Sequence, residues 1–161
     1  MPIVLARVDD RLVHGQVVVG WSQPLDVNFI ILVDDAVAAS DWERQLYVDA
    51  APGVQVLVTT VAEAAADHAA EAAAPGGAFL LVRDLATALR LVEAGAAPGE
   101  FNVGGLHFAP GKTKVCEFVY LDDQDRAHAR ALLARGVALD VRDVPASRGQ
   151  SLASLDPSVK P

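Results

Sequence analysis

The chain has 161 residues, of which 52% are hydrophobic and 21% are charged, so a single domain with its own hydrophobic core is expected. Its 13 basic and 21 acidic residues give a formal net charge of −8, which argues against a protein that binds nucleic acid or an anionic membrane surface. The single cysteine, Cys116, excludes an internal disulfide and a cysteine-rich zinc site, and the four histidines lack paired spacing, so no metal or other cofactor is expected.

Short apolar runs alternate with helix-like segments along the whole chain. The runs predicted as strands are Pro2–Val8, Val27–Val33, Val54–Val58, Ala78–Val82, Phe101–Val103, Val115–Leu121 and Val137–Val141. The segments predicted as helices are Gln16–Ser22, Ala38–Ala50, Val61–Ala74, Asp84–Glu93 and Asp123–Ala134. This alternation predicts an α/β fold, with a mostly parallel open sheet of about seven strands and helices on both faces in a Rossmann-like three-layer arrangement.

The ends of the chain carry further expectations. Charged residues between Arg7 and Arg11 interrupt the first apolar run, which argues against a signal peptide, and no uncharged stretch is long enough for a membrane span. We therefore expect a cytoplasmic protein in which residues 1–161 form one domain. The Ser- and Pro-rich stretch 145–161 is expected to be a loosely held C-terminal tail, and Trp21 and Trp42 are expected to pack on the first two helices.

The loop after the first strand carries the most chemistry. It reads Arg7-Val8-Asp9-Asp10-Arg11-Leu12-Val13-His14-Gly15-Gln16. In open parallel sheets ligands bind at the carboxyl ends of the strands, which is where this loop lies. The imidazole of His14 is a nucleophile that can accept a phosphoryl group near neutral pH and release it again. A polar loop whose carboxylates cap the next helix, with His14 as a surface side chain, is the alternative.

The other residue types of this loop suit a phosphoryl site. Arg7 and Arg11 can hold phosphoryl oxygens through bidentate, charge-assisted hydrogen bonds. Gly15 lets backbone N–H groups approach the phosphate at the start of a helix. Asp9 or Asp10 can hold the arginines or fix the tautomer of the imidazole.

The segment from Asp9 to Val17, followed by Trp21, resembles the phosphorylation-site motif of the enzyme IIB component of the mannose/fructose/sorbose family of the bacterial phosphotransferase system. The resemblance covers about residues 2–145. Its further segments are Val33-Asp34-Asp35-Ala36-Val37-Ala38, Pro52-Gly53-Val54, Asn102-Val103-Gly104-Gly105, Gly111-Lys112-Thr113, and Ala134-Arg135-Gly136-Val137 with Val141-Arg142.

The resemblance implies a protein-phosphohistidine–sugar phosphotransferase. His14 would accept the phosphoryl group on Nδ1 from the phosphohistidine of a separate IIA protein. It would then pass the group to a sugar taken up through the membrane subunits IIC and IID, which could recruit the protein to the inner face of the membrane. By analogy Arg7 and Arg11 would bind the phosphoryl oxygens, and Asp10 would shape the loop. The residues implied to line the phosphate cleft are Asp9, Gly15, Asp34, Gly104 and Gly105.

Several alternatives stay open at this point. Phosphorylation of His14 could instead regulate docking to another protein without sugar transport. A small-molecule enzyme that uses the same cleft without phosphorylation would need a second acid–base group that the sequence does not reveal. The identity of the sugar is open, as is the oligomeric state, for which a homodimer is one alternative, and the sequence leaves open which ring nitrogen of His14 is phosphorylated. His107 stands where the resemblance leads us to expect a small residue, and its role is open as well.

Overall fold

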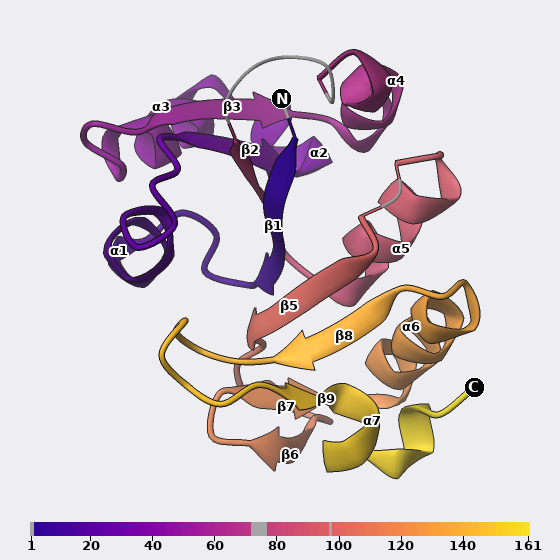
Figure 1. Cartoon of the computed structure of the whole chain (residues 1–161). Coiled ribbons are helices and arrows are strands. Elements are labelled where there is room, and N and C mark those ends of the chain that lie inside the picture. The colour runs from indigo at the N-terminus through magenta and orange to yellow at the C-terminus, as the bar shows by residue number, and fades with distance from the viewer. Residues whose placement is uncertain (1, 72–76, 97) are drawn as a thin grey trace.

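The computed structural model describes residues 2–71, 77–96 and 98–161 (Figure 1). The strands are β1 (Ile3–Asp9), β2 (Phe29–Val33), β3 (Gln55–Thr59), β4 (Ala78–Val82), β5 (Glu100–Gly105), β6 (Thr113–Cys116), β7 (Val119–Leu121), β8 (Ala138–Val141) and β9 (Gln150–Ser151). The helices are α1 (Gly15–Val17), which continues as the π-helical turn η1 (Val18–Ser22), α2 (Asp35–Ala38), α3 (Asp41–Asp49), α4 (Val61–Glu71), α5 (Leu85–Glu93), α6 (Asp123–Ala134), α7 (Leu152–Leu155) and the 3₁₀ turn η2 (Pro157–Val159).

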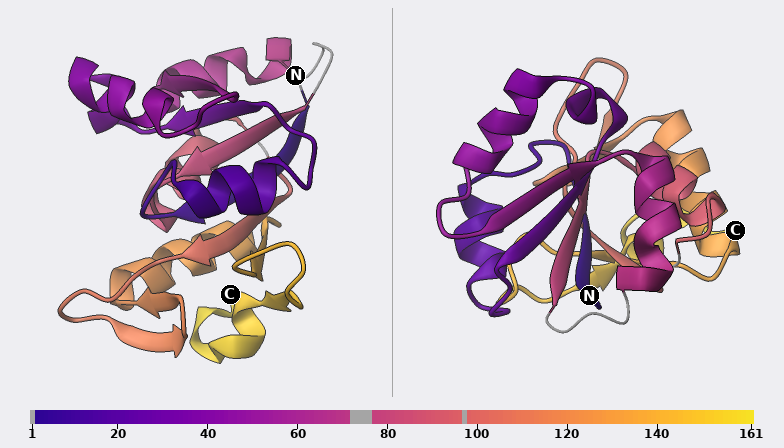
Figure 2. Two further views of the ribbon diagram at one scale, coloured as in Figure 1. Left: turned by 90° about the vertical axis from the view of Figure 1, so that its left-hand side faces the viewer. Right: turned by 90° about the horizontal axis from the view of Figure 1, so that it is seen from above.

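Seven strands form one sheet in the order β3-β2-β4-β1-β5-β8-β9. All neighbouring pairs are parallel except β8 and β9, which are antiparallel. In the view from above, α1 and α3 lie on one side of the sheet, and α4, α5 and α6 lie on the other (Figure 2). The predicted mostly parallel α/β fold is confirmed.

Two hydrophobic cores lie on the two faces of the sheet. All five residues of β4 are buried, and alternate ones face opposite sides: Leu80 and Val82 belong to one core, and Phe79 and Leu81 to the other. A strand covered on both faces has no solvated side, which is why this run is continuously apolar instead of alternating with polar residues.

The strand order places a crevice at the end of β1. From β1 the chain crosses over to β2, toward the β3 edge of the sheet. From β5, which pairs with β1, it continues to β8, toward the opposite edge. Connections that leave two neighbouring parallel strands in opposite directions open a crevice between their carboxyl ends. The loop that contains His14 starts there (Figure 1).

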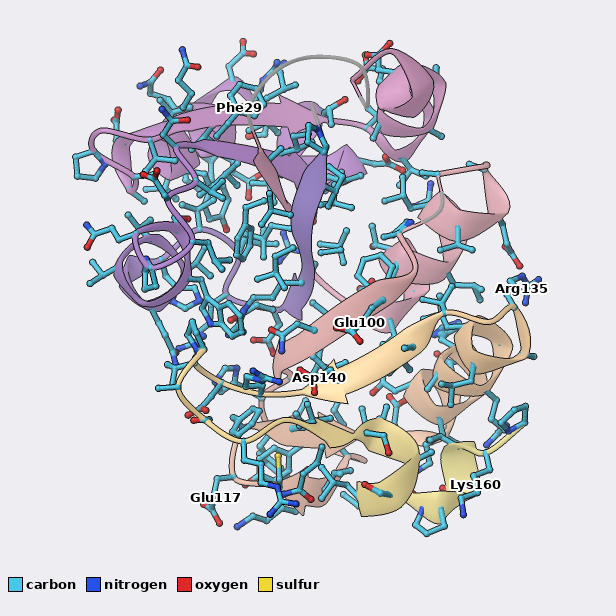
Figure 3. The ribbon with its side chains drawn as sticks, in the orientation of Figure 1. Phe29, Glu100, Glu117, Arg135, Asp140 and Lys160 are labelled. Atoms are coloured by element: carbon cyan, nitrogen blue, oxygen red, sulfur yellow. The ribbon has the colours of Figure 1, made fainter. Side chains whose placement is uncertain are left out.

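Two predicted elements differ from the structure. The run Val115–Leu121 was expected to be one strand, but it turns at Glu117, at the periphery of the molecule (Figure 3), and forms the antiparallel hairpin of β6 and β7 outside the main sheet. The predicted helix Ala38–Ala50 begins only at Asp41, as α3, because the hydroxyl of Ser40 accepts a hydrogen bond from the N–H of Glu43 and caps the helix there; Ala38 is the last residue of the separate α2. The last residues of the predicted helix Val61–Ala74 lie outside the described ranges.

The expectation of a loosely held tail is wrong for most of its length. The stretch after residue 145 supplies β9, α7 and η2. Leu152 and Val159 are fully buried, and the carboxylate of Asp156 accepts a hydrogen bond from Nε of Arg126 at 2.7 Å. Apolar residues that are sparse in a Ser- and Pro-rich stretch therefore anchor it, because each one enters the core formed by other elements.

The two tryptophans behave differently. Trp21 is buried in one of the cores, as predicted, but Trp42 is 70% exposed on α3, so its predicted packing role is wrong. Across the described ranges, every helix is too short or too polar to cross a bilayer.

Candidate functional site

Arg7 lies in the middle of the sheet and is fully buried. Its Nη1 donates to the side-chain carbonyl of Asn102 and to the backbone carbonyl of Arg142, and its Nη2 donates to Asp9 Oδ2 at 3.0 Å and to the carbonyl of Gly104 at 3.2 Å. Burial lowers the pKa of the Arg7 guanidinium, and the Asp9 carboxylate opposes that shift. Arg7 was expected to bind phosphoryl oxygens, but in the structure its guanidinium is buried and donates its hydrogen bonds to acceptors within the protein.

Asp9, at the carboxyl end of β1, is the centre of the site. Its fully buried carboxylate accepts hydrogen bonds from Arg7, from the backbone N–H, Nε and Nη2 of Arg11 at 3.1–3.2 Å, and from Nε2 of His14 at 3.0 Å. Burial alone would raise the pKa of Asp9, but the hydrogen bonds from His14 and Arg11 and the charge of Arg7 hold it well below its usual range. Asp9 is therefore ionised near neutral pH.

The contact with Asp9 fixes the ring of His14. An ionised carboxylate can only accept hydrogen bonds, so Nε2 of His14 must carry the proton in this contact. In the neutral ring the lone pair then resides on Nδ1. The side chain is 19% exposed, and His14 is the extended residue that immediately precedes α1. The contact thus defines Nδ1 as the ring nitrogen of His14 that lacks a proton in the neutral form.

A strained turn returns the chain from Asp9 to His14. Leu12 has φ of +59°, a left-handed conformation that is costly for a residue with a branched side chain. Its fully buried side chain and the hydrogen bond from its N–H to the carbonyl of Asp9 at 3.0 Å hold it there. Burial of Leu12 therefore stabilises the turn that brings the imidazole back to the carboxylate.

Gly104 and Gly105 make room for the buried charges. A Cβ on Gly104 would overlap the Arg7 guanidinium, and one on Gly105 would lie 2.9 Å from Oδ1 of Asp9. The two glycines were expected to border the cleft, and the structure gives the physical reason: the side chains of Arg7 and Asp9 lie across the backbone of β5 at this point.

Arg11 and Gln16 connect the loop to the far side of the crevice. The Arg11 side chain is 39% exposed, and its Nη2 donates to Oε1 of Gln16 at 2.9 Å. The side-chain amide of Gln16 and the indole N–H of Trp21 both donate to the carbonyl of Asp143, at 3.4 and 2.7 Å. The segment after β8, the strand that pairs with β5, is therefore bound to the loop and to η1 by these hydrogen bonds.

A family model described as the sorbose subfamily IIB component of the phosphotransferase system matches residues 3–158. The chain belongs to this family of IIB components. The resemblance seen in the sequence is confirmed, and the protein is a phosphotransferase component of that system.

Individual relatives agree with the family match. This IIB component is 36% identical over 152 residues to the N-acetylgalactosamine-specific phosphotransferase enzyme IIB component 1 of Escherichia coli strain K12, covering 93% of this chain and 96% of that one. It is 38% identical over 161 residues to the mannose-specific EIIAB component of the same strain, covering 99% of this chain but 47% of the relative, so it spans about half of that protein. The crystal structure of the IIBSor domain of the sorbose permease from Klebsiella pneumoniae superimposes with a TM-score of 0.87 at 34% identity over 96% of both chains.

Three further predicted site residues of this IIB component are Asp10, Gly15 and Asp34, and only the first two lie in the His14 loop. Asp10 contacts His107, and Gly15 begins α1 at a position where an added Cβ would have nothing within 4 Å. Asp34 was predicted to line the same cleft, but its contacts lie elsewhere: it caps α2 by accepting the N–H of Val37 and forms an ion pair with Arg83 at 2.8 Å. Asp34 therefore organises the end of β2 and not the His14 loop.

Asn102 of this IIB component has a structural role that only the fold reveals. Asn102 accepts from Arg7 and donates its side-chain N–H to the carbonyl of Arg142 at 3.0 Å. The sequence feature that could have pointed to this role is an amide side chain within an apolar strand. A buried polar side chain of this kind needs a hydrogen-bond partner. The sequence could not say which partner that was.

Proposed function

We propose that this IIB component carries a phosphoryl group on Nδ1 of His14, received from a phosphorylated IIA protein and passed to a sugar. The observation that carries the proposal is the 3.0 Å contact between Nε2 of His14 and the ionised carboxylate of Asp9. It keeps Nε2 protonated and leaves Nδ1 as the attacking nitrogen.

The transfer needs positioning and charge stabilisation more than acid–base chemistry. As Nδ1 bonds to phosphorus, the P–N bond of the donor phosphohistidine breaks, and positive charge develops on the His14 ring. Asp9 stabilises that charge through the Nε2–H hydrogen bond. In the second half-reaction a sugar hydroxyl bonds to the same phosphorus, the bond to Nδ1 breaks, and the hydroxyl proton is released.

Arg11 and Arg7 take different parts in this proposal. Arg11 is partly exposed beside His14 and would hold phosphoryl oxygens together with the backbone N–H groups at Gly15. Arg7 is buried, and its part is to fix the position and charge of Asp9. The arginine closer to the transferred group is thus Arg11.

The relatives support the choice of partners. The E. coli mannose-specific relative is named as a combined EIIAB component, which supports a IIA donor for this chain. The family context favours membrane subunits IIC and IID as the route to the sugar and as the means of recruitment to the membrane. The relatives' names specify N-acetylgalactosamine, mannose and sorbose, so the proposal covers a sugar without naming one.

Phosphorylation of His14 can be located directly. With phosphoenolpyruvate, the general phosphotransferase proteins and a matching IIA, we expect one phosphate on the peptide that contains His14, labile to acid and stable to base. His14→Ala should abolish the label, whereas the control His128→Ala, on α6, should retain it. Acid-stable label, or label that survives in His14→Ala, would contradict the proposal. Label on His14 that never reaches a sugar in membranes containing IIC and IID would favour a regulatory phosphohistidine module instead.

Arg11→Lys is expected to slow transfer from phospho-IIA by about tenfold, because lysine keeps the charge but loses the planar fork that contacts Asp9 through Nε and Nη2. Rapid-quench measurement of His14 phosphorylation tests this. Arg44→Lys, an exposed arginine on α3, is the matched control and should react at the wild-type rate. A wild-type rate in Arg11→Lys would remove Arg11 from the mechanism.

A further inference from the structure

His107 makes a two-point contact with the phosphorylation loop. Its backbone N–H donates to Oδ2 of Asp10 at 2.7 Å, and its ring Nδ1 lies 2.6 Å from Oδ1 of the same carboxylate. We infer that His107 is a positioning residue for phosphoryl transfer, which fastens the loop through Asp10 so that His14 is held for reaction. The inference rests on the proposed function of His14.

Two consecutive carboxylates each bind one imidazole at this end of β1. Asp9 accepts from Nε2 of His14, and Asp10 contacts Nδ1 of His107. The N–H of Asp10 also donates to the carbonyl of Gly105 at 2.9 Å, so its backbone is bound to the last residue of β5 and its side chain to the segment that follows. The residue that follows the partner of His14 is thus anchored at three points.

The contact between Asp10 and His107 lies next to the strained turn at Leu12. Arg11 and Leu12 follow Asp10 directly, and Leu12 holds its left-handed conformation. A strained turn keeps its geometry only where its surroundings over-determine it. Burial of Leu12 supplies one restraint, and the contact between Asp10 and His107 supplies a second at the opposite end of the turn. Loss of the second restraint lets the turn relax and displaces the Asp9–His14 pair.

His107 is itself fixed by the β6–β7 hairpin. The preceding residue, Leu106, donates its N–H to the carbonyl of Phe118 at 2.9 Å and accepts from the N–H of Tyr120 at 2.7 Å. The ring of Phe108, the following residue, packs edge-on against Tyr120 with centroids 5.8 Å apart. Because both neighbours of His107 are attached to the hairpin, the contact with Asp10 couples the hairpin to the phosphorylation loop.

The contact discriminates between similar side chains. Any residue at position 107 supplies the backbone N–H, but only some supply a donor where Nδ1 lies. The amide nitrogen of asparagine is one atom beyond Cγ, as Nδ1 of histidine is, whereas that of glutamine lies one atom further out. Asparagine can therefore preserve the contact, and glutamine of nearly the same polarity cannot. The side chain is 47% exposed, so neither replacement disturbs the core.

The test compares His107→Asn, His107→Gln and His107→Ala in transfer from phospho-IIA, with kcat and KM for IIA measured separately. We expect His107→Asn to stay within about twofold of the wild-type kcat, and the other two variants to lose about tenfold in kcat with KM unchanged, since misplaced reacting groups lose rate and not affinity. Thermal unfolding of all three variants should match that of the wild type.

Three results would overturn the inference. Equal rates in the asparagine and glutamine variants would show that the Nδ1 contact is irrelevant, and a rise in KM at constant kcat would make His107 a docking residue. A wild-type kcat in His107→Ala would remove it altogether. These results leave His14 phosphorylation in the wild-type protein intact, whereas absence of label from wild-type His14 would overturn the proposed function and this inference together.

Discussion

Asp9→Asn is expected to lower the rate of phosphoryl transfer to His14 by about a hundredfold or more, because loss of a carboxylate that orients a reactive imidazole has effects of at least this size. In the structure five donors converge on Asp9: Nη2 of Arg7, the backbone N–H, Nε and Nη2 of Arg11, and Nε2 of His14. An asparagine has one side-chain oxygen to accept hydrogen bonds, and its own N–H groups would face the donors that now contact the second oxygen of Asp9. The ring of His14 then loses the partner that keeps its proton on Nε2.

The same substitution should destabilise the fold by about 3–5 kcal/mol, because it leaves the buried guanidinium of Arg7 without a counter-charge. Asp35→Asn, which removes the carboxylate of a largely exposed pair with Arg90, is the matched control and should cost less than about 1 kcal/mol. Urea unfolding measures both values, and nitrogen NMR of the His14 ring reports the tautomer. A ring that keeps its proton on Nε2 in Asp9→Asn would contradict the assigned role of Asp9.

The difference in unfolding free energy between the wild type and Asp9→Asn should depend on pH, in a direction that the pKa of Asp9 sets. The pKa of Asp9 lies below its ordinary value in the folded protein, so the unfolded chain binds a proton first as the pH falls. The stabilisation from Asp9 is fully present above the unfolded pKa of about 4 and is lost as the pH falls toward the folded pKa. The stability gap between wild type and Asp9→Asn should therefore be widest above about pH 5 and narrow below about pH 4.

Gly104→Ala is expected to destabilise the protein by about 3 kcal/mol or more, because a methyl group would overlap the guanidinium of Arg7, which is fully buried and held in place by four hydrogen bonds. Transfer to His14 should also fall, since displacing Arg7 displaces Asp9. Calorimetric unfolding and the transfer rate test the two effects.

Gly99→Ala, just before the same strand, is the control for that substitution. A Cβ there has nothing within 4 Å, so the change in stability should be within about 0.5 kcal/mol. If Gly104→Ala proved as stable as Gly99→Ala, the close approach of Arg7 to the backbone of β5 would not hold in solution.

The sequence alone indicated the α/β class, most strands of the sheet and the place of the site. The two apolar runs that become β2 and β4 are continuous because both faces of the sheet are covered, and this is a local pattern that a single sequence displays. The loop from Asp9 to Gln16 is contiguous, so its concentration of charge beside a histidine was visible without a structure. The family resemblance rested mainly on that loop.

Only the tertiary structure decided which groups face one another. Arg7 meets Asn102 across 95 positions and the carbonyl of Arg142 across 135, and Asp10 meets His107 across 97. These pairings depend on the register of β1 with β5 and of β5 with β8, which local hydrophobic patterns do not encode. The sequence therefore predicted that both Arg7 and Arg11 contact the phosphoryl group. In the fold Arg7 is buried against Asp9, and only Arg11 is partly exposed.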